Sequence, residues 1–285
     1  MSKRKSLSQY PNRIQQCVFC GQVPLTKEHF WPSWMKEAIP QSKYNQHLRV
    51  ESDGKKKIRY FSEGVQKKIT GPPGSWQQKV VCSVCNNGWM SQIETEAKPI
   101  LTALAFGESV EIKKKEQIIL SKWAFLKVII GEFNEVPKRY ITREERHFFF
   151  KYKTVPSEWR IWIARLKPAM WGYLYYQTGN NQSYGETVSG NQFIHRSKEA
   201  LFTLGEMVMY VGKYSFREFV VPVPQIEFCI VGEHQRKMNM IQPVTHKTIN
   251  WSSVECLDHS ELLELNNNLR SFTEILTEIN RRYQD

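Results

Sequence analysis

Hydrophobic positions repeat at helical spacing in the stretch that follows residue 86. Trp89, Ile93 and Ala97 fall on one helix face, and Asn86 stands where an amide side chain can cap the first free backbone N–H groups. Pro99 lacks the backbone N–H that a helix interior uses. The pattern therefore predicts a helix that starts at Asn86 and is kinked or ended at Pro99.

Further helices are predicted from apolar spacing and from capping residues. A helix is expected over 116–130, where apolar residues recur at helical intervals. Thr142 and Glu145 match the capping box, in which two side chains three residues apart each bond the other residue's backbone N–H. Asp258 and Glu261 have the same spacing and predict the start of a last helix that runs nearly to the end of the printed sequence.

The pattern changes in the second half of the chain, where short apolar segments rich in aromatic and β-branched residues alternate with Gly or polar breaks. Side chains of these types favour the pleated, half-buried surface of a sheet. The predicted strands are 159–166, 170–177, 201–212 and 226–232. We expect them to form an antiparallel sheet, so that the fold class of the whole chain is α+β.

Length and composition are those of a globular protein. With 285 residues, of which 41% are hydrophobic, the chain can bury one large core or two ordinary ones. No segment stays apolar and uncharged over the roughly eighteen residues of a membrane span, and the first residues lack the apolar stretch of a secretory signal. We therefore expect a cytoplasmic protein with no membrane partner.

The net charge of +12 is concentrated in residues 1–105, which include a polar, basic arm over 1–16 and a basic insertion over about 41–79. A field of this sign attracts polyanions, and phosphate backbones are the commonest polyanions in a cytoplasm. The insertion has Gly and Pro breaks typical of hairpins and loops. Its charges are explained equally well by a surface that lies along DNA and by a solvated edge.

Four of the six cysteines form two pairs with Cys-x-x-Cys spacing, Cys17 with Cys20 and Cys82 with Cys85. In a reducing compartment such pairs are typical of zinc sites rather than of disulfides, because two thiolates at this spacing can hold the same tetrahedral ion. We therefore expect the four cysteines to share one structural Zn²⁺. The other two cysteines are isolated and are interpreted as small buried residues.

An acid and a histidine, Glu28 and His29, lie between the two cysteine pairs, and Asn86 follows the second pair directly. Hydrolysis of a phosphodiester with one metal ion needs a base that titrates near neutral pH, hard oxygen ligands for a divalent cation, and a rigid frame. The imidazole of His29, the carboxylate of Glu28 and the amide of Asn86 meet the first two needs, and a four-thiolate zinc meets the third. The constellation predicts phosphodiesterase chemistry.

The order Cys-x-x-Cys, Glu-His, Cys-x-x-Cys-Asn resembles the HNH or His-Me finger superfamily, most closely its endonuclease VII-like branch, over residues 17–98. The resemblance implies a ββα-metal module, a hairpin followed by a helix, with the zinc behind the active site and one catalytic Mg²⁺ or Mn²⁺ in front. It implies that His29 is the general base and that Glu28 and Asn86 hold the catalytic cation. The chain has Glu28 where that branch usually has Asp, and Asn86 in place of a final His.

Two neighbours of this constellation leave alternatives open. Asn87 stands beside Asn86, and only one of them can face a metal; we choose Asn86 because it directly follows Cys85. Glu94 lies further along the predicted helix. It is either an auxiliary acid on the metal-facing side or, as such residues more often are, a solvated helix residue.

These observations suggest a basic arm over 1–16, a zinc-containing nuclease domain over 17–106 and an α+β domain over 107–285 that selects a substrate or partner. The leading hypothesis is a metal-dependent DNA endonuclease, with RNA as the other candidate substrate, serving phage defence or a mobile element. Cutting both strands of a duplex with one active site per chain favours a homodimer. The alternative hypothesis is a non-catalytic, zinc-stapled module that binds nucleic acid or protein.

Overall fold

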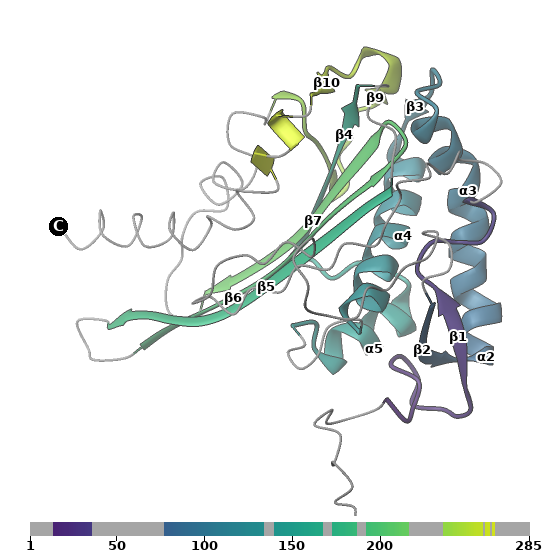
Figure 1. Ribbon diagram of the computed structural model, residues 1–285, viewed down its shortest axis with the longest axis vertical. Helices are drawn as coiled ribbons and strands as arrows, with labels where there is room; N and C mark the ends of the chain where they lie inside the picture. Colours follow the sequence, from purple (N-terminus) through teal and green to yellow (C-terminus); the bar gives the residue numbers. More distant parts are fainter. Residues whose placement is uncertain are drawn as a thin grey trace, which may run out of the picture.

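The computed structural model describes residues 14–35, 77–133, 140–167, 173–186, 192–216, 236–258, 260–262 and 264–265. Three predicted features lie wholly or mostly outside the described residues: the basic arm, the basic insertion and the strand over 226–232. In the described part of the chain, helices pack on a large and mainly antiparallel sheet, so the α+β class is confirmed (Figure 1). None of the described helices is long and apolar enough to cross a membrane.

A hairpin followed by helical turns forms the N-terminal part of the described structure. β1 (Leu25–His29) pairs antiparallel with β2 (Gln77–Cys82). β2 leads directly into α2 (Ser83–Cys85), the π-helical turn η2 (Asn86–Met90) and α3 (Ser91–Ala105). The hairpin lies beside these helical turns in Figure 1. Among the described residues, β1, β2 and the helical turns therefore occur in this order along the chain.

The helical turns after β2 differ from the prediction at both ends. They begin at Ser83, and Asn86 makes no side-chain cap, so the prediction of Asn86 as the N-cap is wrong. α3 continues through Pro99 to Ala105, which corrects the expectation that it could end at the proline. A proline removes one backbone hydrogen bond from a helix. The buried side chains of this helix, such as Leu101, offset that loss by packing.

Two further helices match the sequence pattern closely. α4 (Lys114–Glu132) contains the predicted 116–130 and is buried over most of its length. α5 (Arg143–Tyr152) begins at the predicted capping box. The Glu145 N–H donates to Thr142 Oγ1 at 3.2 Å, and the Thr142 N–H donates to Glu145 Oε2 at 2.8 Å. The predicted box is thus confirmed in both directions.

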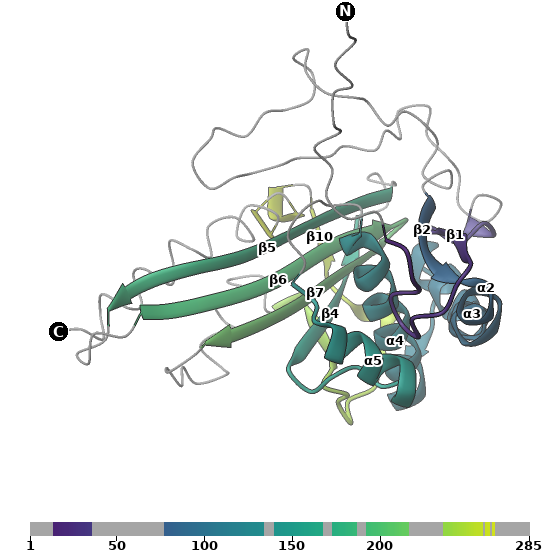
Figure 2. The same ribbon diagram turned by 90° about the horizontal axis from the view of Figure 1, so that it is seen from below.

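The sheet has the strand order β10-β4-β7-β6-β5, with β8 also paired to β4. Its strands are β4 (Trp159–Leu166), β5 (Tyr173–Glu186), β6 (Gln192–Leu204), β7 (Met207–Phe216), β8 (Asn239–Gln242) and β10 (Cys256–Leu257). Only the β10 pairing with β4 is parallel among the described pairs. Strands β5, β6 and β7 extend well beyond the helices (Figure 2).

The segment predicted as one strand over 201–212 is two strands joined by a tight turn. β6 ends at Leu204, β7 begins at Met207, and Gly205 between them has a φ of +56°. A Cβ at Gly205 would lie 2.3 Å from the carbonyl oxygen of Ala105 at the end of α3. The glycine therefore permits both the turn and the close approach of α3 to the sheet.

The last described turn of the chain starts as predicted. The Glu261 N–H donates to Asp258 Oδ1 at 3.1 Å, and the Asp258 N–H donates to Glu261 Oε2 at 2.7 Å. Helical residues follow over 260–262 and 264–265. The rest of the predicted last helix lies outside the described residues.

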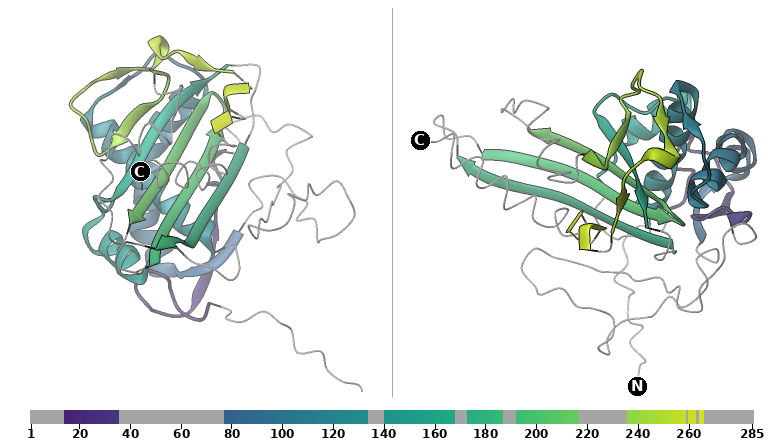
Figure 3. Two further views of the ribbon diagram at one scale, coloured as in Figure 1. Left: turned by 90° about the vertical axis from the view of Figure 1, so that its left-hand side faces the viewer. Right: turned by 90° about the horizontal axis from the view of Figure 1, so that it is seen from above.

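One face of the sheet packs on α4, and the helices lie behind the sheet when it is seen face on (Figure 3). The buried apolar side chains form a continuous cluster from Cys17 at the first cysteine pair, through Trp123 of α4, to Trp251 in the short helix η5 (Trp251–Ser253). β3 (Glu111–Ile112) and β9 (Ile249–Asn250) pair near this end. A second, smaller cluster lies on the other face of the sheet, around Trp162 and Tyr210.

Candidate metal centre and the residues around His29

The four paired cysteines come together at one end of the β1–β2 hairpin. Their sulfur atoms all lie within 4.8 Å of one another, and they form the one group of three or more Cys, His, Asp or Glu side chains in the described part of the chain that could hold a metal ion. Cys20 Sγ lies 3.5 Å from Cys82 Sγ and 3.6 Å from Cys85 Sγ. The predicted four-cysteine cluster is therefore confirmed.

The chemistry and spacing of the cluster suit a structural zinc ion. Four sulfurs at ~2.3 Å from a tetrahedral ion are separated from one another by ~3.8 Å, close to the distances found here. Cys17, Cys82 and Cys85 are buried and Cys20 is half-buried. Burial raises the pKa of the Cys20 and Cys85 thiols, since it disfavours the thiolate form that zinc binding would restore.

Local backbone bonds explain how the first cysteine pair folds into its loop. The Gly21 N–H donates to Cys17 O at 2.9 Å, and the Cys17 N–H donates to Gln22 O at 3.0 Å. Gly21 has a φ of +77°, which only glycine adopts without strain. The Val18 N–H also donates to Val80 O at 3.0 Å, so the loop is tied to β2 beside the second cysteine pair.

An aromatic cluster joins this end of the hairpin to α5. Trp89 packs edge-on against Phe19 at 4.9 Å and against Phe149 of α5 at 5.7 Å between ring centroids. The Lys153 ammonium at the end of α5 lies 4.6 Å from the centre of the Trp89 ring. Trp89 therefore contributes to packing beside the cysteine cluster.

His29, the last residue of β1, contacts β2, and Asn86 contacts β1. The Nε2 of half-buried His29 lies 2.6 Å from Nε2 of Gln77, its partner on β2. Asn86 Nδ2 donates to Thr26 Oγ1 at 3.2 Å and to Lys27 O at 3.3 Å. Because both bonds use Nδ2, the amide oxygen of Asn86 is not committed to β1. Of the two adjacent asparagines, Asn86 is thus the one that lies against the first strand.

Glu28 has a different set of partners. Its buried carboxylate Oε1 lies 3.4 Å from Nζ of Lys127, which comes from α4. Lys127 also pairs with Glu94 of α3 and donates to the backbone oxygen of His29 at 3.2 Å. The structure thus brings Glu28 and Glu94 together around the ammonium group of Lys127. Asn86 bonds Thr26 and the backbone of Lys27 instead.

The protonation of this cluster reflects two opposing effects. Burial raises the pKa of Glu28, and the nearby ammonium of Lys127 acts against that rise. Burial works against the charge on Lys127, but the carboxylates of Glu94 and Glu28 outweigh it, so the pKa of Lys127 is raised above its usual value. Lys127 is therefore a charged group held inside the protein.

The sequence pattern did not predict a role for Lys127. It stands in the apolar run WAFLKVII, and its partners are 33 and 99 residues away along the chain. The one available signal was a lone lysine inside a strongly apolar helix, because a buried lysine needs partners of opposite charge. Nothing in the sequence pattern indicated which carboxylates those partners would be.

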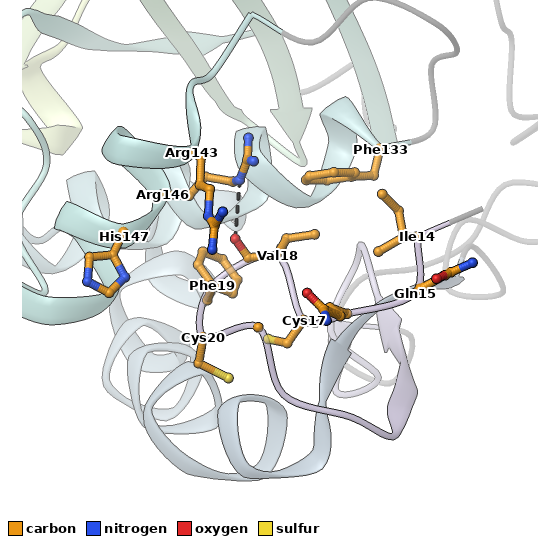
Figure 4. Close-up of a pocket in the computed structure, with 12 residues that line it drawn as sticks. Ile14, Gln15, Cys17, Val18, Phe19, Cys20, Phe133, Arg143, Arg146 and His147 are labelled. Carbon is orange, nitrogen blue, oxygen red and sulfur yellow. Dashed lines mark hydrogen bonds between the residues drawn. The ribbon is translucent and has the colours of Figure 1, made fainter. Parts of the chain in front are cut away.

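A pocket of about 750 Å³ lies between the first cysteine loop and α5 (Figure 4). Arg143, Arg146 and His147 of α5 line one side, and none of the described residues that line it is acidic. Arg146 Nε donates to Val18 O at 3.2 Å, the bond drawn in Figure 4, so this arginine also holds the loop in place. The pocket is suited to an anion by its charge.

Comparisons of this chain with protein-family models, with curated proteins and with solved structures found no match.

Proposed function

We propose that this protein is a metal-dependent DNA endonuclease that uses His29 as its general base. The observation that carries the proposal is the placement of Asn86, which lies in the helical turns after β2 and bonds the same strand that ends in His29. The four-cysteine cluster lies where β2 meets these turns and would hold the unit together with zinc. A base, an amide oxygen and a rigid frame thus lie on one small unit.

In the proposed reaction, His29 takes a proton from the attacking water as that water reaches the phosphorus. Gln77 lies against Nε2 of His29; with its amide oxygen turned toward an Nε2–H group it would orient the ring and leave the Nδ1 lone pair to take the proton. Glu28 and Asn86 are the residues proposed to hold Mg²⁺ or Mn²⁺, which would supply charge stabilisation for the leaving 3′ oxygen. The amide oxygen of Asn86 suits such a hard cation, and Glu28 would share its carboxylate between the cation and Lys127.

The charges near His29 agree with the proposed need for a divalent cation. Two carboxylates, Glu28 and Glu94, share the single ammonium of Lys127. In their ionised forms they leave one negative charge beside His29, which would repel a phosphodiester that approached alone. A bound divalent cation would offset this repulsion.

Two features support DNA as the substrate. Lys27 and Lys79 are exposed on the hairpin that carries His29, and Arg143 lines the pocket over the first cysteine loop. Positively charged side chains at separate points of one unit are expected where a phosphate backbone runs across a surface. RNA would meet the same charges and is therefore the second substrate to be tried.

A binding module without catalysis is the second candidate, and one observation favours it. Because Lys127 already neutralises the buried carboxylate of Glu28, that residue has a structural partner and needs no metal. A zinc-stapled module that binds nucleic acid would account for the cysteines and for the basic surface. It would not require His29 to lie at a strand end beside Gln77.

Nicking of supercoiled plasmid with added Mg²⁺ or Mn²⁺ separates the two candidates. We expect the wild type to cut, His29→Ala with equal zinc content to lose turnover by about 100-fold or more, and EDTA to stop the wild type. His246→Ala is the matched control, because this exposed histidine lies far along the chain from the hairpin. Equal cutting by wild type and His29→Ala would refute the proposal, and absence of cutting with retained DNA binding would favour the binding module.

A further inference from the structure

Lys127 is a charged side chain with no exposed surface, placed in the middle of α4. The residues on either side of it in the helix, Leu126 and Val128, are also fully buried. An ammonium group taken out of water is strongly destabilising unless acceptors replace its hydration. Its partners are therefore the reason that it can remain there.

Those partners use the whole donor capacity of the group. An ammonium has three N–H donors, and Lys127 meets three acceptors: the carboxylates of Glu28 and Glu94 and the backbone oxygen of His29. Two acceptors belong to the end of β1 and one to α3. With no exposed surface and no donor to spare, Lys127 has no way to touch a substrate.

We infer that Lys127 is a positioning residue for the His29 centre, an inference that rests on the proposed function. Its ammonium holds the backbone of His29 and the carboxylate of Glu28 against α3 and α4. Gln77 holds the His29 ring from the other side, on β2. The general base is thereby fixed at its backbone by one element and at its ring by another.

The irregular pairing of β1 explains why the end of this strand needs an additional contact. The pairing of β1 with β2 shifts its register between Thr26 and Glu28, so the regular ladder is interrupted just before its last two pairs, at Glu28 and His29. An irregularity of this kind re-aims the side chains beyond it and weakens the local pairing. Lys127 restores a fixed position to the last two residues of the strand.

The composition of the cluster also favours a geometric role over a stabilising one. A buried ion pair contributes little to stability compared with apolar side chains of the same volume. A cluster of two acids and one base is poorer still, because one carboxylate charge has no counter-charge within it. The presence of Lys127 inside an apolar helix is therefore better explained by its effect on the positions of Glu28 and His29 than by a gain in stability.

Lys127→Met tests this, because methionine keeps the length of the side chain and removes the charge. Lys115→Met on the exposed start of α4 is the matched control. We expect Lys127→Met to keep its zinc, to lose about 100-fold in kcat and to leave KM for DNA unchanged, because a small misplacement of a base costs rate rather than binding. Lys115→Met should match the wild type in both constants.

Two measurements do not depend on turnover and keep the inference separate from the proposed function. Hydrogen exchange should become faster at the backbone amides of His29 and Phe30 in Lys127→Met, and the imidazole signal of His29 in a ¹³C-histidine spectrum should shift. If the wild type cuts nothing, the nuclease proposal fails, and these two readouts still decide whether Lys127 positions His29. Unchanged exchange with an unchanged His29 signal would overturn the inference, as would normal kcat with a raised KM.

A second variant covers the case in which Lys127→Met does not fold. Glu94→Gln keeps an oxygen acceptor on α3 and leaves Lys127 paired with Glu28. We expect a folded protein with kcat lowered about 10-fold, the same direction of change in exchange at the end of β1, and unchanged KM. Wild-type kcat and exchange in this variant would overturn the inference.

Discussion

At the scale of single residues, α4 carries two buried ionisable side chains with different contacts. Lys127 bonds Glu28 of the hairpin, and Glu132 at the helix end accepts a backbone hydrogen bond from the segment that precedes α5. The Glu132 Oε1 accepts the backbone N–H groups of Tyr140 at 2.5 Å and of Ile141 at 2.9 Å. Burial raises the pKa of Glu132, and the nearby Lys198 acts against that rise. One carboxylate thus holds the residue at which the chain enters α5.

Glu132→Ala should therefore destabilise the protein, by roughly 2 to 4 kcal/mol in the free energy of unfolding, because two backbone N–H groups lose their acceptor and Lys198 loses a counter-charge. Urea denaturation at equal zinc content measures the change. Glu108→Ala removes an exposed carboxylate and should lie within about 0.5 kcal/mol of the wild type. A Glu132→Ala protein as stable as this control would show that the carboxylate makes no net contribution.

At the scale of elements, the hairpin of β1 and β2 pairs two strands that are far apart in the sequence. Residues 30–76 separate its strands in the chain, so pairing them costs the entropy of bringing together two segments that are far apart in the sequence. The cysteine cluster joins the two strands at the end where Leu25 faces Cys82. A bound zinc ion would supply the closure that a short turn supplies in an ordinary hairpin.

Cys82→Ser should therefore lose zinc and loosen the hairpin together. We expect less than full zinc stoichiometry after purification and faster hydrogen exchange along β1 and β2, because metal binding and folding of the unit are coupled. Cys256→Ser removes a cysteine outside the cluster and should keep its metal. Full zinc content with a protected hairpin in Cys82→Ser would contradict the assignment of this thiolate as a ligand.

The elements that sequence patterns predicted well are those specified by near neighbours. The Thr142 and Glu145 cap, the strand at 159–166 and the cysteine pairs each depend on spacing within a few residues. One alternative that spacing left open and one wrong prediction were both decided by tertiary contacts. α3 passes Pro99 because packing outweighs one lost hydrogen bond, and the 201–212 segment folds back at Gly205 because α3 lies against that turn.

In the candidate site, too, local spacing predicted some features and tertiary contacts determined the others. His29 was predicted from the Glu-His pair, and the structure places it at the end of a strand that Asn86 also contacts. The partner of Glu28 was not predicted, because Lys127 is 99 residues away and lies in a helix assigned to the other part of the chain. Local spacing indicates which residue types carry chemistry, and only the packing of α4 shows what surrounds them.

At the scale of the whole molecule, α4 is the element that both halves share. Its Lys127 holds the end of the hairpin, and its Trp123 packs edge-on against Phe202 of the sheet at 6.0 Å between ring centroids. Trp251 from late in the chain donates through its Nε1 to Leu104 O at the end of α3. The buried apolar residues form one continuous cluster between these points. The predicted division near residue 106 stays a prediction, which unfolding can test.

We expect the zinc-loaded protein to unfold in one transition, because a continuous core makes the hairpin and the sheet lose their packing together. Tryptophan fluorescence, far-UV circular dichroism and hydrogen exchange at β1 should give the same urea midpoint. Trp123→Phe, which weakens the contact of α4 with the sheet, should lower all three midpoints equally. If the hairpin opened at a lower urea concentration while β4 and β7 stayed protected, the unit predicted over 17–106 would be a separate domain, and Lys127 would join two domains rather than two parts of one core.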